Sequence, residues 1–131
     1  MTAAMKETIS TAENAPQAVG PYSLAVKSGT LVFTAGQLGM DAASGKLVEG
    51  GVQAQTKKAL ENLSAVLKAA GSDISQILKV TVFLQDMDDF SAMNEIYATF
   101  FTDNPPARSA VEVAALPKEG LVEIEAIAYL K

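Results

Sequence analysis

Residues 121–130 read Leu-Val-Glu-Ile-Glu-Ala-Ile-Ala-Tyr-Leu. Every second residue from Val122 to Leu130 is apolar, which is the period of a β-strand with one face against a core. The opposite face carries Glu123, Glu125, Ile127 and Tyr129. A half-apolar sheet face in a small domain is typical of a subunit contact. We therefore expect a homo-oligomer.

The segments before this strand alternate between strand and helix patterns. Apolar residues at three- and four-residue steps predict a helix over 52–70, and a second helix starts at the acidic cluster near residue 86 and stops before Pro105. Residues 77–84 are apolar on both strand faces apart from two positions, which predicts a central strand covered on both sides. The fold expected is α+β, with two helices on one face of a mixed six-stranded sheet. The six strands are 5–9, 22–27, 31–38, 77–84, 108–115 and 121–130.

Composition and charge indicate a single-domain protein and argue against nucleic-acid binding and against a membrane span. The 131 residues are 49% hydrophobic and 19% charged, which predicts a single domain over residues 1–131. Ten basic and fifteen acidic residues leave a formal charge of −5, which argues against nucleic acid as a partner. The longest charge-free stretch, 28–40, is too short and polar to span a membrane. Because the segment starting at Met1 lacks the pattern of a signal peptide, we expect a cytoplasmic protein.

The missing residue types limit the chemistry. The chain has no His, Cys or Trp, which excludes thiolate nucleophiles, Cys/His zinc sites and Ser-His-Asp relays. Carboxylates, hydroxyls, Lys, Arg and backbone groups remain.

Arg108 is the single arginine of the chain and follows Pro105-Pro106-Ala107 at the start of a predicted strand. Its planar guanidinium matches a carboxylate through two parallel hydrogen bonds, which lysine cannot do. A structural salt bridge with one of the fifteen acidic residues is an equally good interpretation.

Five further positions are candidates, each with an ordinary alternative. Glu123 and Glu125 point the same way and suit acid/base work, or form a polar sheet face. Asn94 lies beside the apolar stripe of the second helix and either reaches a ligand or satisfies a backbone group. Tyr22 forms a pocket wall or packs in the core. Gly36 brings its backbone close to a ligand or makes a turn.

Ordered motifs along nearly the whole chain resemble the RidA (YjgF) family of reactive intermediate deaminases, which includes proteins named as translation inhibitors. The motifs are Asn14-Ala15-Pro16, Gly20-Pro21-Tyr22-Ser23, Gly36-Gln37, Ala59-Leu60-Glu61-Asn62-Leu63, Lys79-Val80-Thr81-Val82-Phe83-Leu84, Pro106-Ala107-Arg108-Ser109 and Val122-Glu123-Ile124-Glu125-Ala126.

This resemblance implies a fold similar to chorismate mutase of the Bacillus type, with the last strand inside the sheet. It also implies a homotrimer with ligand clefts between subunits. The implied activity is that of a 2-iminobutanoate/2-iminopropanoate deaminase, a hydrolase acting on C–N bonds. Such an enzyme converts enamines and imines such as 2-aminoacrylate and 2-iminobutanoate to 2-keto acids and ammonia, with no metal or organic cofactor.

The resemblance also implies residue roles. Arg108 would bind the substrate carboxylate, the backbone at Gly36 and Ala110 would donate hydrogen bonds, and Glu123 would orient the attacking water. Tyr22 and Asn94 would line the cleft. Many family members carry Ser at position 35 and Cys at position 110, where this chain has Ala35 and Ala110. These differences favour an alternative, a non-catalytic protein that binds 2-keto acids. A ribonuclease or translation inhibitor is a further alternative, which the missing His and the acidic charge disfavour.

Overall fold

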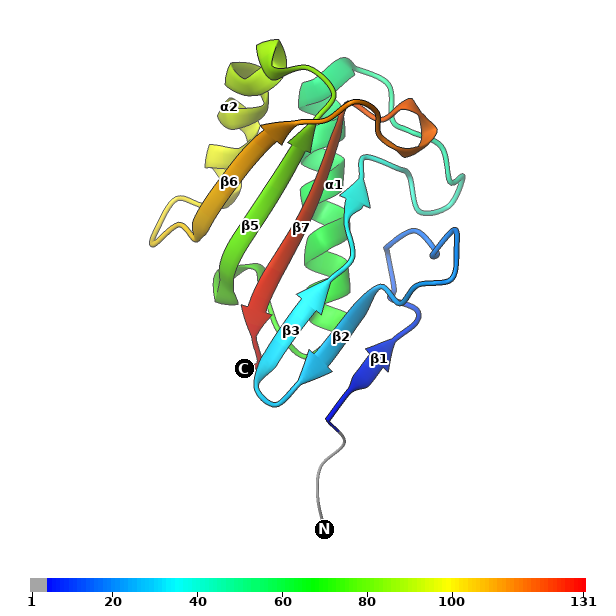
Figure 1. Cartoon of the computed structure of the whole chain (residues 1–131), viewed down its shortest axis with the longest axis vertical. Coiled ribbons are helices and arrows are strands. Elements are labelled where there is room, and N and C mark those ends of the chain that lie inside the picture. The colour runs from blue at the N-terminus through cyan, green and yellow to red at the C-terminus, as the bar shows by residue number, and fades with distance from the viewer. Residues whose placement is uncertain (1–4) are drawn as a thin grey trace.

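The computed structural model describes residues 5–131, so the first four residues of the N-terminal segment interpreted above lie outside it. Figure 1 shows a twisted sheet with helices behind it. The elements in chain order are β1 (Glu7–Ile9), β2 (Ala25–Ser28), β3 (Leu31–Thr34), β4 (Gln37–Leu38), α1 (Gly51–Ala69), β5 (Ile77–Leu84), α2 (Phe90–Phe100), β6 (Ala107–Glu112) and β7 (Val122–Tyr129).

The last strand, β7, lies inside the sheet. The strand order is β1-β2-β3-β7-β5-β6, and β4 pairs with β7 beyond the end of β3. All neighbours are antiparallel except β5 and β6, which run parallel. The mixed sheet and the interior position of the last strand are therefore confirmed. β6, which carries Arg108, is an edge strand whose outer side has no strand partner among residues 5–131.

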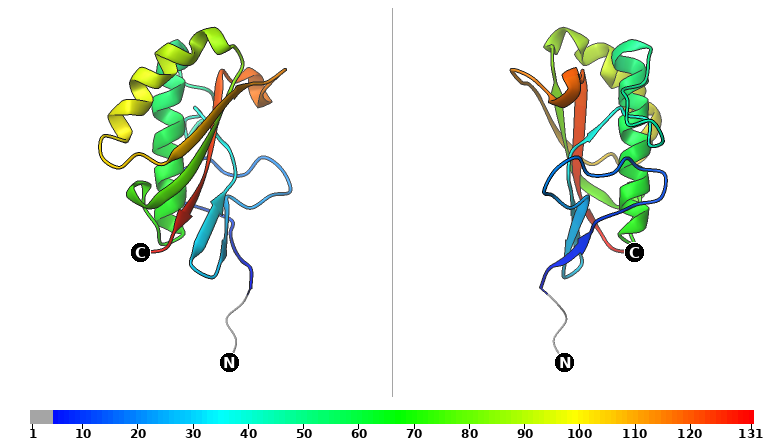
Figure 2. Two further views of the ribbon diagram at one scale, coloured as in Figure 1. Left: turned by 60° about the vertical axis from the view of Figure 1, so that its left-hand side comes forward. Right: turned by 90° about the vertical axis from the view of Figure 1, so that its right-hand side faces the viewer.

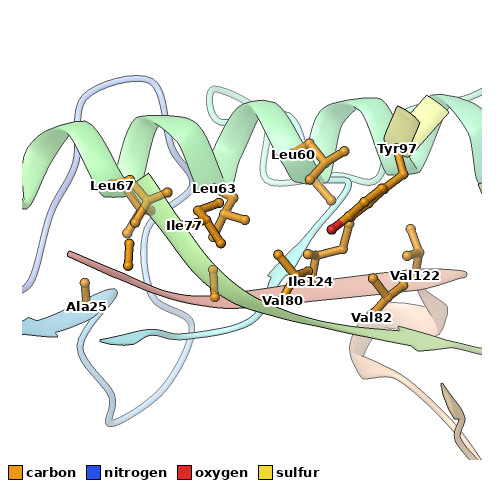
Figure 3. Close-up of a cluster of buried hydrophobic side chains, with 14 of the residues drawn as sticks. Ala25, Leu60, Leu63, Leu67, Ile77, Val80, Val82, Tyr97, Val122 and Ile124 are labelled. Carbon is orange, nitrogen blue, oxygen red and sulfur yellow. The ribbon is translucent and has the colours of Figure 1, made fainter. Parts of the chain in front are cut away.

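Both helices cover the same face of the sheet (Figure 2), which confirms the predicted α+β architecture. The core lies between α1 and the central strands, and Figure 3 shows Leu60 and Leu63 of α1 facing Val80 and Ile124. Alternation along β7 places Val122, Ile124, Ala126 and Ala128 in this core. Glu123 and Glu125 consequently point to the opposite, open face.

The predicted strand 31–38 is divided in two. Its ends form β3 and β4, while Ala35 and Gly36 leave the ladder, so the sheet of the described chain has seven strands rather than six. At the break, the Ala35 N–H donates to the Leu24 carbonyl, and the Thr34 hydroxyl accepts from the Ala126 N–H at 3.0 Å. Side-chain periodicity does not reveal such a break, because the break depends on contacts with Leu24 and Ala126, which are distant in sequence.

The open face of the sheet is uncovered in the single chain. The prediction that both faces of 77–84 are covered is wrong for one chain, because Leu78 is 47% exposed at a register shift between Ile77 and Lys79. Phe33 and Tyr129 on the same face are 41% and 42% exposed. Neither helix among the described residues is long and apolar enough to cross a membrane.

Candidate functional site

Arg108 points from the edge strand β6 toward α2. Its Nη1 donates to the amide oxygen of Asn94 at 2.7 Å, and its guanidinium carbon lies 4.6 Å from the centre of the Tyr97 ring. A second ring, Phe90, lies 5.4 Å away. These aromatic faces attract the cation and fix the plane of its guanidinium group. We call Arg108, Asn94, Tyr97 and Phe90 the Arg108 group.

No carboxylate occupies the guanidinium. Within residues 5–131, the ion pair found within 4.0 Å joins Lys27 to Glu7. The alternative that Arg108 forms a structural salt bridge is therefore wrong for the described chain. Its remaining N–H groups make no hydrogen bond to a described residue, so they are available to an anion.

Asn94 does not use its amide oxygen to satisfy a backbone group, because that oxygen accepts from Arg108. Its contact with a ligand stays a prediction. Phe90, Asn94 and Tyr97 follow one another at four- and three-residue steps, so α2 presents all three on one face. Burial raises the pKa of the Tyr97 phenol, and the positive charge of Arg108 opposes that shift. The guanidinium therefore lies against a neutral ring.

Glu123 lines a cavity of about 320 Å³ on the other side of the molecule. Tyr22 and Gly36 also line this space, together with apolar side chains that include Pro16, Met40 and Pro117. We call it the Glu123 cavity. Sequence reasoning missed Pro16, Met40 and Pro117, because their loops have no periodicity and come together only in the fold.

Gly36 packs directly against the Glu123 carboxyl. A Cβ atom built on Gly36 would lie 2.7 Å from Cδ and Oε2 of Glu123, a distance that real Cβ atoms do not show. Only glycine allows the backbone to approach the acid this closely. The close approach, rather than a turn, explains the residue at this position.

The environment favours the neutral form of Glu123. Burial raises the pKa of its carboxyl, and the negative charge of Glu125 raises it further. Among the described residues, 5–131, no lysine or arginine lines the cavity to oppose these effects. A carboxyl group that carries a proton more readily near neutral pH suits general acid/base chemistry.

Tyr22 is a cavity wall and not a core residue. It is 46% exposed, and its hydroxyl oxygen accepts a hydrogen bond from the Val19 N–H at 3.2 Å. This contact ties the ring to the preceding loop.

The six candidate positions thus form two separate sets. Arg108, Asn94 and Ala110 lie on the helix-covered side at the β6 edge, whereas Glu123, Gly36 and Tyr22 surround the cavity. The register agrees, because Arg108 pairs with buried Val80 while Glu123 pairs with Phe83 on the open face. Within one chain the sheet separates the two sets.

Among residues 5–131, no three His, Cys, Asp or Glu side chains are grouped so that they could hold a metal ion. The expected absence of a metal or organic cofactor stays a prediction.

Comparison with known proteins accounts for this arrangement of motifs. A family model described as Endoribonuclease L-PSP matches residues 12–130. The chain belongs to the L-PSP family. Its relatives carry the RidA and YjgF names, which confirms the family that the motifs resemble.

Three similar proteins illustrate the relationship. A RutC family protein of Pyrococcus horikoshii is 54% identical over 125 residues, which are 95% of this chain and 98% of that protein. A protein of Capra hircus named 2-iminobutanoate/2-iminopropanoate deaminase is 53% identical over 128 residues, 98% of this chain and 93% of its own. The crystal structure of RidA from Psychrobacter, 46% identical, superposes with a TM-score of 0.89 and covers 95% of this chain and 99% of that one. The chain thus shares the L-PSP fold over the residues that these comparisons cover.

Proposed function

We propose that this protein hydrolyses reactive enamines and imines, such as 2-aminoacrylate and 2-iminobutanoate, to 2-keto acids and ammonia. Mammalian relatives with about half of their residues identical carry the name of that activity. The observation that carries the proposal is Arg108, a guanidinium that is ordered by Asn94 and two rings but has no carboxylate partner. A 2-imino acid supplies that carboxylate.

The complete site requires two subunits. Among residues 5–131, the lining of the Glu123 cavity includes an acid and no cation, so the cavity offers no charged partner to a substrate carboxylate. The Arg108 group has the cation but no acid or water-orienting group. We infer that the β6 edge of one subunit meets the Glu123 cavity of the next, with Tyr22, Gly36, Asn94 and the Ala110 backbone around the substrate.

The open sheet face supports this assembly. Phe33, Leu78, Val111 and Tyr129 are each more than 40% exposed in the single chain. A contact between two different patches repeats around a ring until it closes. We propose a homotrimer with three such sites, as the family resemblance implies.

The chemistry needs no strong nucleophile, because an imine carbon is already electrophilic. Glu123 orients a water molecule and accepts its proton as the oxygen bonds to C2. The π electrons of the C=N bond move to the nitrogen, which receives the proton held by Glu123. The new hydroxyl group then gives its proton to the nitrogen, the C–N bond breaks, and ammonia leaves as the C=O bond forms. Arg108 holds the carboxylate throughout, and placement by fixed groups supplies much of the acceleration.

A coupled assay tests the proposal. An amino-acid dehydratase that releases 2-aminoacrylate supplies the substrate, and keto-acid formation is measured with and without the protein. The wild-type protein should accelerate formation and Arg108→Ala should abolish the effect, while Lys118→Ala, which changes an exposed cation, should not. Tight binding of pyruvate without acceleration would instead support the non-catalytic 2-keto-acid binding protein that Ala35 and Ala110 favour.

Two further expectations remain proposals. We propose that the chain does not bind nucleic acid, because its formal charge is −5 and it has one arginine. RNA cleavage by the purified protein that disappears in Glu123→Gln would contradict this. We also propose a cytoplasmic location, which fractionation would test.

A further inference from the structure

Two side-chain amides of α1 bind the backbone around the Glu123 cavity. Asn62 is fully buried, and its Nδ2 donates to the carbonyl oxygens of Leu38 at 3.1 Å and Met40 at 2.9 Å. Gln55 is 6% exposed, and its Oε1 accepts from the Leu121 N–H at 2.9 Å. Leu38 belongs to β4 and Leu121 immediately precedes β7. One helix therefore fastens both strands that meet at the acid.

The backbone between these contacts is closely packed and hydrogen-bonded. Gly39 lies so close to α1 that a Cβ atom on it would be 2.5 Å from the Cα of Gln55. Its carbonyl accepts from the Val48 N–H at 2.9 Å. Each carbonyl from residue 38 to residue 40 thus has a partner, and losing one would leave a buried polar group unsatisfied.

Residues 38–40, which Asn62 holds against α1, also form part of the wall of the Glu123 cavity. Leu38 is the ladder partner of Glu123, and the side chains of Leu38 and Met40 line the cavity wall. Two residues earlier, Gly36 touches the Glu123 carboxyl. A small displacement of β4 from α1 would therefore change the gap in which water and substrate must fit.

We propose that Asn62 and Gln55 are positioning residues, which hold β4 and the start of β7 against α1 and so set the gap between the Gly36 backbone and the Glu123 carboxyl. This inference rests on the proposed deamination. Asparagine has a low helix propensity and lies here in the middle of a 19-residue helix. The carbonyl groups of Leu38 and Met40 explain why an amide is placed there.

The test compares Asn62→Ala and Gln55→Met with Leu67→Ala. Leu67 is a buried residue of the same helix, and Figure 3 places it at the Ala25 end of the core, away from Val122. For each variant, kcat and KM are measured at a temperature where the protein is folded, and backbone amide exchange is followed residue by residue. Leu67→Ala controls for a general loss of stability.

Asn62→Ala should lower kcat about tenfold and change KM less than about threefold, because the Arg108 group is untouched. Its amide exchange should accelerate at residues 36–40 and 121–124 and stay unchanged in β5 and β6. Gln55→Met should show a smaller effect of the same kind, and it carries the test alone if Asn62→Ala does not fold. Leu67→Ala should keep kcat within about twofold.

The proposal is overturned if Asn62→Ala and Gln55→Met keep the kcat of Leu67→Ala, or if exchange accelerates evenly along the chain. A wild-type protein without deaminase activity would overturn the proposed function alone. In that case, faster amide exchange confined to residues 36–40 and 121–124 in Asn62→Ala would still support the positioning role of Asn62. Faster exchange along the whole chain would contradict it.

Discussion

Arg108 on β6 is held by side chains, whereas Glu123 on β7 is held against backbone. The guanidinium donates to Asn94 and lies over Tyr97, so directional contacts fix its plane. The carboxyl of Glu123 instead lies against Gly36, and it is partly removed from water with no cation in its cavity. The Arg108 group therefore presents a positive charge, whereas the Glu123 cavity disfavours a negative charge on its carboxyl.

This difference explains why the sheet separates the two regions within one chain. An arginine beside Glu123 would lower the pKa of the carboxyl. The resulting carboxylate would also occupy the guanidinium that the substrate needs. Placing the residues on opposite sides of the sheet prevents this ion pair in the free subunit. The two regions then need a second subunit to act together.

Removing the acid should have the largest effect. Glu123→Gln keeps the shape but cannot accept a proton, so kcat should fall about 10²–10⁴-fold while KM changes little. Steady-state kinetics with 2-iminobutanoate measure both. Glu61→Gln on the exposed side of α1 is the control. Full activity in Glu123→Gln would remove this residue from the chemistry.

Adding a methyl group between the Gly36 backbone and the Glu123 carboxyl should have the second-largest effect on activity. Gly36→Ala places a methyl group where Glu123 lies at 2.7 Å, so the carboxyl must move and kcat/KM should fall about 100-fold. Gly20→Ala is the control, because a Cβ atom there meets its nearest neighbours at an ordinary 3.5 Å. Equal activities of the two variants would mean that the close approach has no catalytic consequence.

Removing the hydrogen bond that holds the Arg108 guanidinium should have a smaller effect than the two preceding changes. It should act on substrate binding more than on the chemical step. Asn94→Ala removes the 2.7 Å hydrogen bond to Arg108, so KM should rise about tenfold with kcat less affected. Ser91→Ala changes an exposed residue of the same helix and should behave as the wild type. A fall in kcat at constant KM would place Asn94 in the chemical step instead.

The smallest effect concerns stability and pH. In the free subunit no arginine of the described residues lines the cavity, and burial raises the pKa of Glu123 above its usual 4.5, so the folded subunit keeps this proton to higher pH than the unfolded chain. The stability from this group in the free subunit is therefore complete below pH 4.5 and is lost as the pH rises through the folded pKa. Glu123→Gln cannot ionise, so the Tm of its free subunit should exceed that of the wild-type subunit at neutral pH, and the gap should close in acid. Thermal unfolding of the dissociated subunits between pH 4 and 8 measures this, and a gap that grows in acid would contradict it.

Particular residues show how far the sequence leads. The alternation in 122–130 and the helical spacing of 52–70 identify the layers, because burial of one face imposes a period on each element. The solitary Arg108 and the motif around Glu123 identify the candidate site. The alternation also places Glu123 on the open face, whereas the side on which Arg108 lies depends on the pairing of β6 with β5, which leaves no local pattern. The break at Ala35–Gly36 and the role of Asn62 are hidden for the same reason, because both arise from contacts distant in sequence.

Subunit mixing tests the central claim most directly. Arg108→Ala and Glu123→Gln, each inactive alone, are unfolded together in equal amounts and refolded. If each site takes its arginine from one subunit and its acid from the next, random assembly should restore about a quarter of the sites and a similar share of wild-type activity. Activity no greater than that of the separate variants, in mixed oligomers verified by mass, would contradict a site shared between subunits.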